Sequence, residues 1–434
     1  MSHKIGFWSV FALVIGSQIG SGVFLTPAEL APYGIYSLGG LAIASIGAIA
    51  LALVFAQLCA WFPQTGGPHV YVEHAFGKTA AFFTGWTYWV ISWVSSTVLI
   101  IGAIRYLTPF IGELPPTITI ALQIALLAAI TLLNFFGVQA AGRAEFILTV
   151  LKIAPLLTIP LLGLAYFSSN NFVVDTTVAH LSTTGLLSQA AVLSMWGFIG
   201  VESATTPAGS VENPTRTIPL AVITGTTCTA LLYLLNSVGI MGVIPGSELM
   251  RSNAPYVDAV KYIIGGNWHL LISVLAAIIC IGSLNAWMLT SGQIALGLAQ
   301  DGLFPRWFGK KNSYDAPFWG LAASALGIIP FLLLSAQQGL AHQINVIINY
   351  SVTGFLFVYA LSCLAFLKLL FKRAGSSSGK IVSLIYGLFA CTFCCWTIAQ
   401  SSLTSIAVAS LFTLSGLPFY VHYRCKQQSF NHNQ

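Results

Sequence analysis

Apolar stretches about twenty residues long recur along the whole chain, and each is long enough to cross a bilayer as an α-helix. Composition agrees with this pattern. Of the 434 residues, 56% are hydrophobic and 6% are charged, whereas soluble domains carry about 25% charged residues. The sequence therefore predicts an all-α integral membrane protein with a single transmembrane domain over residues 1–434.

Turn-forming residues divide the chain into twelve expected spans. The clearest connections are Pro63–Pro68, Pro115-Pro116 and Gly375–Gly379, which are rich in proline, glycine and serine. An even number of spans leaves both termini on one side of the membrane. The expected spans are residues 6–31, 37–61, 79–107, 116–136, 144–167, 186–206, 218–243, 268–298, 317–336, 344–370, 380–399 and 403–423.

Basic residues predict the orientation of these spans. Of the 17 Lys and Arg residues, thirteen fall on the face shared with the termini, three (Arg105, Arg251, Lys261) on the opposite face, and Lys152 within a span. By the positive-inside rule, both termini are expected in the cytoplasm. The net charge of +6 is thus explained by the orientation of the spans in the membrane, and we expect no nucleic-acid partner.

The eight cysteines lie mostly inside apolar segments, where they are typical of small core residues, so no metal site is expected.

One stretch, Ser194–Thr206, breaks the apolar pattern. It contains Gly197 and Gly200, and it places the ionisable Glu202 at membrane depth. A charge there costs roughly 2.5–3.5 kcal/mol on insertion scales, so such groups usually face a cavity or a partner. The alternative is a glycine pair that packs helices, with Glu202 reaching to an interface. We favour a functional site.

The first span contains a similar interruption, Gly16-Ser17-Gln18-Ile19-Gly20-Ser21-Gly22. Paired broken helices mark the binding region of transporters built from inverted repeats. The two breaks open successive sets of five expected spans, which predicts repeats over residues 1–167 and 186–370, followed by helices over 380–423. Unwound backbone exposes N–H groups that suit a carboxylate and carbonyls that suit an ammonium. The alternative is a small-residue motif for helix crossing.

Five motifs carry a family resemblance. They are Gly-Ser-Gly-Val-Phe-Leu at 20–25, Pro-x-x-Gly-Gly at 63–67, Trp-Gly-Phe-Ile-Gly-Val-Glu-Ser at 196–203, Asn-Pro-Thr-Arg-Thr-Ile-Pro at 213–219 and Asp-Gly-Leu-Phe-Pro at 301–305. In this order they resemble the amino acid–polyamine–organocation transporter superfamily, and within it the bacterial arginine/agmatine and basic amino acid antiporters. The resemblance covers nearly the whole chain. It implies a 5+5 inverted-repeat (LeuT-like) fold with broken helices 1 and 6, in a bacterial inner membrane.

The resemblance also implies where a substrate binds. Gly20, Ser21 and Gly22 would receive the substrate carboxylate, with Ser17 beside them in the same break. Main-chain carbonyls of the second break would receive the α-ammonium, and the residues concerned are Trp196, Phe198 and Ile199.

Four further roles follow from the resemblance. Trp196 would be a gate over the site, Glu202 would couple its helix to protonation or to a gate, and Tyr88 would be a gating tyrosine. Trp287 would stack on the substrate side chain, where a tryptophan face offers a cation about 0.5–2 kcal/mol. The alternative for Trp287 is packing against lipid or a neighbouring helix.

The chain departs from the antiporters at two positions. Ser96 stands where they carry an asparagine, and one hydroxyl replaces an amide, which weakens arginine as the substrate. Lys152 stands where they carry an apolar residue, and it resembles the lysine of proton-coupled relatives, whose ammonium substitutes for a sodium ion. Gain and loss of its proton would then couple transport to H⁺. The alternative is a lysine that snorkels to the cytoplasmic surface.

His69 follows the second expected span, next to Pro68 and near Tyr71. Histidine changes charge between pH 5 and 8 more readily than other side chains. A pH-sensing role for His69 is therefore one hypothesis, and an ordinary loop histidine is the other.

These features favour a secondary transporter that works by alternating access, with no cofactor. Its expected partners are a small-molecule amino acid or amine and the lipid bilayer. The leading mode exchanges an arginine-like amino acid for its amine, such as agmatine, and the alternative is a proton-coupled symporter or permease of neutral or broad specificity that uses Lys152. An intramembrane enzyme is disfavoured because the histidines fall in loops, termini or span ends. A channel is disfavoured because two broken helices meet at one site. The oligomeric state stays open, with a homodimer as one candidate.

Overall fold

The computed structural model describes residues 4–20, 22–112, 114–252, 254–266, 268–335, 340–373 and 377–421. Within these ranges the chain is helical, and an isolated bridge joins Ile5 to Val211. The helices are α1 (Phe7–Gln18), α2 (Gly22–Leu30), α3 (Tyr36–Trp61), α4 (Pro68–Phe76), α5 (Lys78–Ile111), α6 (Pro116–Phe135), α7 (Val138–Gly163), α8 (Thr183–Met195), α9 (Pro214–Val243), α10 (Gly246–Leu249), α11 (Pro255–Ile263), α12 (His269–Gln300), α13 (Phe318–Ser335), α14 (Leu340–Lys372), α15 (Ser377–Gln400) and α16 (Leu403–Leu414).

Membrane-spanning helices dominate this fold, as the apolar stretches predicted. In the described ranges, 10 helices are long and apolar enough to span, or 11 if the bent pair α1 and α2 forms one span. The multi-pass all-α architecture is confirmed. The number twelve stays a prediction, because α13 is apolar but short. The expected span 144–167 begins earlier, since α7 starts at Val138.

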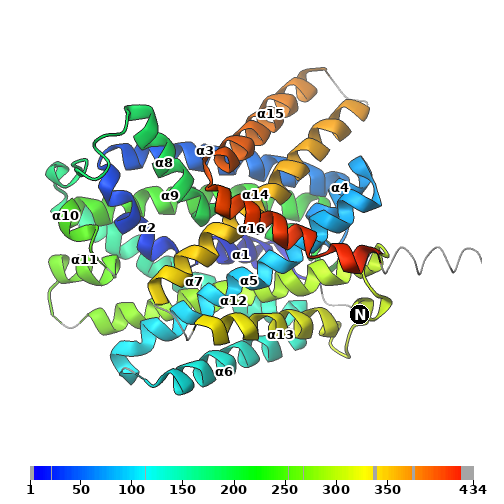
Figure 1. Ribbon diagram of the computed structural model, residues 1–434, viewed down its shortest axis with the longest axis horizontal. Helices are drawn as coiled ribbons and strands as arrows, with labels where there is room; N and C mark the ends of the chain where they lie inside the picture. Colours follow the sequence, from blue (N-terminus) through cyan, green and yellow to red (C-terminus); the bar gives the residue numbers. More distant parts are fainter. Residues whose placement is uncertain are drawn as a thin grey trace, which may run out of the picture.

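The helices form an inner and an outer set. α1 runs through the middle of the bundle (Figure 1), and it packs against α7, α9 and α12. Of the most apolar window of α5, 72% is buried, against 28% for α6 and α15 and 17% for the last span, 403–421. The helices at the edges of the view in Figure 1, α6 and α15, therefore present most of their apolar surface outward. That is the arrangement expected of a bundle surrounded by lipid.

Both predicted interruptions are present. α1 ends at Gln18 and α2 begins at Gly22, with their axes bent by 44°. α8 ends at Met195 and is followed by two short 3-10 turns, η4 (Trp196–Phe198) and η5 (Ser203–Thr205). Between these turns the backbone changes direction, because Ile199 is extended (φ −63°, ψ 130°) and Gly200 has φ +106°. The second broken helix is thus a helix followed by turns.

The two breaks touch each other at Ser17 and Gly200. The Ser17 hydroxyl donates to the carbonyl of Gly200 at 3.1 Å and lies 2.7 Å from the hydroxyl of Ser203. A Cβ atom on residue 200 would come within 2.8 Å of Ser17 Oγ. Glycine is therefore required here for two reasons: a left-handed φ, which side chains rarely adopt, and the close approach of the other break.

Gly200→Ala is expected to lower the thermal unfolding midpoint in detergent. A suitable control is Gly77→Ala, because Gly77 also has a positive φ, +84°, but a Cβ there meets no atom within 4 Å. Strain at a positive φ costs about 1–3 kcal/mol and affects both variants. The extra decrease in the unfolding midpoint of Gly200→Ala, compared with Gly77→Ala, therefore measures the contact between the breaks. Equal losses in the two variants would contradict this interpretation.

Candidate functional site

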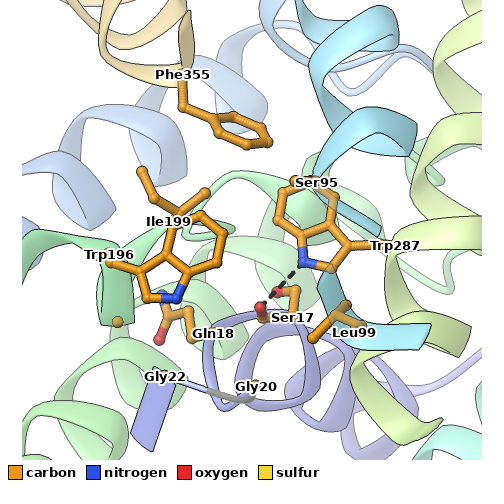
Figure 2. Close-up of a pocket in the computed structure, with 11 residues that line it drawn as sticks. Ser17, Gln18, Gly20, Gly22, Ser95, Leu99, Trp196, Ile199, Trp287 and Phe355 are labelled. Atoms are coloured by element: carbon orange, nitrogen blue, oxygen red, sulfur yellow. Dashed lines mark hydrogen bonds between the residues drawn. The ribbon is translucent and has the colours of Figure 1, made fainter. Parts of the chain in front are cut away.

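A small cavity lies between the two breaks (Figure 2). Its free volume is about 20 Å³, and one water molecule needs about 10–15 Å³. A substrate of amino-acid size therefore fits only after the surrounding side chains move. The cavity is lined by Ser17, Gln18, Gly20, Gly22, Ser95, Leu99, Trp196, Gly197, Ile199, Trp287 and Phe355.

Most of the predicted substrate residues meet at this cavity. Phe198 is buried, its ring packs edge-on against Tyr233 with centroids 5.4 Å apart, and it does not line the cavity. Ser21 lies outside the described residues. The predicted residues that line the cavity are Ser17, Gly20, Gly22, Trp196, Ile199 and Trp287. Their roles in binding stay predictions.

The predicted serine on α5 is displaced by one residue. Ser96 is buried and donates to the carbonyl of Ser92 at 2.8 Å, and it does not border the cavity. Ser95 borders the cavity instead. Successive residues of a helix point about 100° apart, so an assignment that is one residue off selects a different face. The hydroxyl of Ser95 also donates to the carbonyl of Ser92, at 3.1 Å, so the two serines differ in their position relative to the cavity and not in this bond.

Backbone carbonyls released at the end of α1 are satisfied by side chains of other helices. The Ser283 hydroxyl of α12 lies 2.7 Å from the carbonyl of Gly16 and 2.6 Å from that of Ile19. Lys152 Nζ of α7 donates to the same carbonyl of Gly16 at 3.1 Å. These bonds fix the outer side of the break, away from the cavity.

The two carbonyls between them are held in the same way. Trp287 Nε1 donates to the carbonyl of Ser17 at 3.2 Å, drawn as a dashed line in Figure 2. The Tyr233 hydroxyl of α9 donates to the carbonyl of Gln18 at 2.9 Å. The carbonyls of the first break are thus bonded within the protein. The carbonyls predicted to receive the α-ammonium are those of the second break, at Trp196, Phe198 and Ile199, and that role stays a prediction. Any unbonded acceptor at the cavity therefore lies outside the carbonyls of the first break.

Gln18 supplies one such acceptor. Its Nε2 donates to the hydroxyl of Thr226 at 3.0 Å, which leaves its Oε1 buried and without a partner among the described residues. A buried amide oxygen without a donor is uncommon in folded proteins, and this one belongs to a side chain that borders the cavity. Sequence reasoning missed Gln18, because the amide in the break gave no indication of which of its atoms would be bonded.

Aromatic rings form much of the remaining wall. Trp287 is 5% exposed, and its ring centroid lies 5.1 Å from that of Phe355. In Figure 2 the rings of Trp196, Trp287 and Phe355 surround the space above Ser17 and Gln18. Among the described residues that line the cavity, none is charged. Chemically, this wall offers cation–π faces and neutral hydrogen-bonding groups.

Glu202 lies beside the cavity inside the protein. It is fully buried, so the alternative in which it snorkels to an interface is wrong. Its Oε2 accepts a hydrogen bond from the hydroxyl of Tyr359 on α14, and its Oε1 has no partner among the described residues. The same Tyr359 oxygen accepts from the backbone N–H of Gly200 at 3.0 Å. Tyr88, the predicted gating tyrosine, is also buried nearby, within electrostatic reach of Glu202 and Tyr359. Tyr359 is a partner that the sequence did not reveal.

Lys152 is also buried. Its exposed fraction is 0%, so the alternative of a lysine that snorkels to the surface is wrong. It lies next to the α1 break and 3.4 Å from the carboxylate of Glu145, which sequence reasoning missed. A usable signal existed: Glu145 and Lys152 are seven residues apart, two helical turns, and so share one face of α7.

His69 lies apart from the cavity. It is buried, and its Nε2 lies 2.9 Å from Asp301 Oδ2, just beyond the end of α12. This contact links the start of α4 to the end of α12. A role for His69 in pH sensing stays a prediction.

Known proteins resemble the chain along its whole length. A family model described as amino acid permease matches residues 5–421. The cadaverine/lysine antiporter of Escherichia coli (strain K12) is 30% identical over 438 residues, covering 99% of this chain and 97% of that protein. The putrescine transporter PotE of Haemophilus influenzae is 30% identical over 389 residues, covering 89% of each chain. PotE of Escherichia coli (strain K12) is 29% identical over 365 residues, covering 84% and 83%.

These relatives are transporters and not enzymes, and they are named for the transport of an amino acid and of polyamines. The multi-pass helical fold and the two broken helices agree with this comparison. The chain therefore belongs to the amino acid permease family, within the amino acid–polyamine–organocation superfamily of transporters.

Proposed function

We propose that the protein exchanges a cationic amino acid for the amine that its decarboxylation produces, by alternating access. The observation that carries this proposal is the wall of the cavity: aromatic faces and one unpaired amide oxygen, without a charged side chain among the described lining residues. Such a wall attracts cations through ring faces and neutral acceptors.

The amino acid and its amine differ in the carboxylate and share the cationic side chain. A site that exchanges them must therefore hold the shared part well and tolerate loss of the other. The rings of Trp196 and Trp287 and the Oε1 of Gln18 suit the shared cationic end. The backbone N–H of Gly22, at the start of α2, suits the carboxylate, which only one of the two substrates carries.

Lysine and cadaverine are the first pair that we propose. The cadaverine/lysine antiporter resembles the chain over 99% of its length, and a terminal ammonium needs acceptors, which Gln18 Oε1 supplies. Arginine and agmatine, suggested by the resemblance to arginine/agmatine antiporters, form the second pair. A guanidinium is planar and favours paired acceptors, and the described lining offers one unpaired amide oxygen.

Helix packing supports a division into two moving groups. The first group is α1, α2, α3, α8 and α9, in which α3 packs on α8 and α9, and α1 on α9. The second is α5, α6, α12 and α13, in which α12 packs on α5 and α13, and α13 on α6. We propose that these groups rock against each other across the cavity, as two inverted repeats over 1–167 and 186–370 would allow.

The proposed location is a bacterial inner membrane with both termini in the cytoplasm. The support is the distribution of basic residues, thirteen of the 17 on the face shared with the termini and three on the other. Protease accessibility of tags at each terminus in inside-out vesicles would test the orientation.

Reconstituted vesicles provide the direct test of exchange. Uptake of labelled lysine is expected to be rapid into vesicles preloaded with cadaverine and slow into empty vesicles, because a carrier that exchanges returns only when loaded. Agmatine and putrescine preloads rank the alternative amines, and an alanine preload is the negative control. Rapid uptake into empty vesicles under an imposed pH gradient would favour the proton-coupled alternative, and no uptake with any preload would refute the substrate class.

Gln18→Leu is expected to raise the KM for lysine by about tenfold or more, because a hydrogen bond to a charged group contributes about 1.5–3 kcal/mol and each 1.4 kcal/mol is tenfold. The matched control is Gln123→Leu. Gln123 is also buried with an unpaired Oε1, but it lies on α6 and does not border the cavity. A similar KM for both variants would remove Gln18 from the binding site.

A further inference from the structure

A fully buried ion pair lies directly beside the α1 break. Lys152 Nζ is 3.4 Å from Glu145 Oε1, and both side chains are 0% exposed. Of the four ion pairs in the part of the chain that the structure describes, this is the one in which both partners are buried. Buried pairs of this kind have a large desolvation cost, so their polar surroundings decide whether both charges persist.

The surroundings of Lys152 satisfy its ammonium completely. Besides Glu145, the nitrogen donates to the carbonyl of Gly16 at 3.1 Å and to the hydroxyl of Ser283 at 3.2 Å. An ammonium has three N–H donors, and each has an acceptor here. A neutral amine has two N–H donors and could therefore donate to at most two of these three acceptors.

The surroundings of Glu145 favour its ionised form in the same way. Asn285 Nδ2 donates to Oε2 at 2.8 Å, and the hydroxyl of Thr149 lies 3.3 Å from Oε1. Asn285 is oriented by two further bonds, since it accepts from Asn134 Nδ2 at 3.1 Å and donates to the carbonyl of Ala141 at 3.1 Å. Both carboxylate oxygens of Glu145 therefore have donors.

Two glycines make room for the pair. A Cβ atom on Gly16 would collide with Glu145 Oε1, and a Cβ atom on Gly282 would collide with Lys152 Cε. The backbones of α1 and α12 thus approach the pair directly. The other titratable group within electrostatic reach of Lys152 is the Cys280 thiol of α12. In the described parts of α1, α6, α9 and α11, no further charged or titratable group interacts with Lys152 or Glu145.

We propose that Glu145 keeps Lys152 protonated throughout transport, so that Lys152 is a fixed cation that holds the α1 break and not a carrier of coupling protons. With both groups ionised the pair has no net charge. If the lysine proton left for the aqueous phase, Lys152 would become a neutral amine and Glu145 an uncompensated buried carboxylate, which is strongly unfavourable. This inference rests on the proposed exchange function and assigns its mode, substrate-for-substrate exchange without a proton.

The test uses Glu145→Gln in the full-length protein in vesicles. Glutamine keeps the size of the side chain and removes the charge, so Lys152 loses its counter-charge and can release its proton on one side and regain it on the other. Wild-type protein is expected to ignore a pH gradient. In the variant, an acidic exterior should drive labelled lysine into empty vesicles, approaching about tenfold accumulation for one pH unit if one proton accompanies each substrate.

Asp315→Asn is the matched control, because it removes the carboxylate of an exposed pair with Lys311 at 3.0 Å. It should leave both exchange and the response to the gradient unchanged. Gradient-driven uptake by the wild type would overturn the inference, and so would a Glu145→Gln variant that responds to the gradient as the wild type does.

If the Glu145→Gln variant cannot be reconstituted in vesicles, thermal unfolding provides a second test. Thermal unfolding midpoints of Glu145→Gln, Lys152→Met and the double variant form a cycle. The double variant is expected to melt above either single variant, because each single change strands a buried charge. Losses that simply add would overturn the inference. Failure of wild-type exchange with every preload would refute the proposed function alone, since the melting cycle still reports on the ion pair.

Discussion

The structure depends on one requirement: carbonyls released where a helix unwinds inside a membrane need donors, because lipid supplies none. At the end of α1 these donors are side chains of three other helices, α7, α9 and α12. The break is therefore held from outside, and its shape follows from the positions of its neighbours. This explains how α1, which runs through the middle of the bundle in Figure 1, can end inside the protein.

Charge is arranged around the cavity and kept out of its described lining. Glu202 has a tyrosine partner and Glu145 a lysine partner, and neither carboxylate borders the cavity. A carboxylate in the wall would lose its counter-charge each time a cationic substrate left, and a stranded buried charge is strongly unfavourable. Ring faces and an amide oxygen hold a cation less tightly, but they remain acceptable when the substrate has gone. Such a wall suits a carrier that must release what it binds.

Much of the fold could be predicted from the sequence, because residues that do not suit a membrane-spanning helix are easily recognised within an apolar stretch. Glycines and an ionisable residue inside an apolar stretch have few explanations, so both breaks were located correctly, and Trp196 and Trp287 lie on the cavity as predicted. The details that failed depend on rotation about a helix axis. One residue turns a side chain by about 100°, which is why Ser95 and not Ser96 borders the cavity.

Contacts between residues far apart in the chain could not be predicted from the sequence. Tyr359 and Glu202 are 157 residues apart in the sequence, and no local pattern predicts their contact. Glu145 was missed for a different reason, since α7 begins six residues before the expected start at 144, so a residue expected near the surface lies inside.

The backbone of Gly200 links α14 to α1. Its N–H is tied to α14 through Tyr359, and its carbonyl is tied to α1 through Ser17. Peptide planes are stiff, so the two dihedral angles of Gly200 are the rotatable bonds between these two points of attachment. The hydroxyl of Tyr359 thus contacts both the carboxylate of Glu202 and the backbone beside the cavity, so a shift of this one ring changes the surroundings of both.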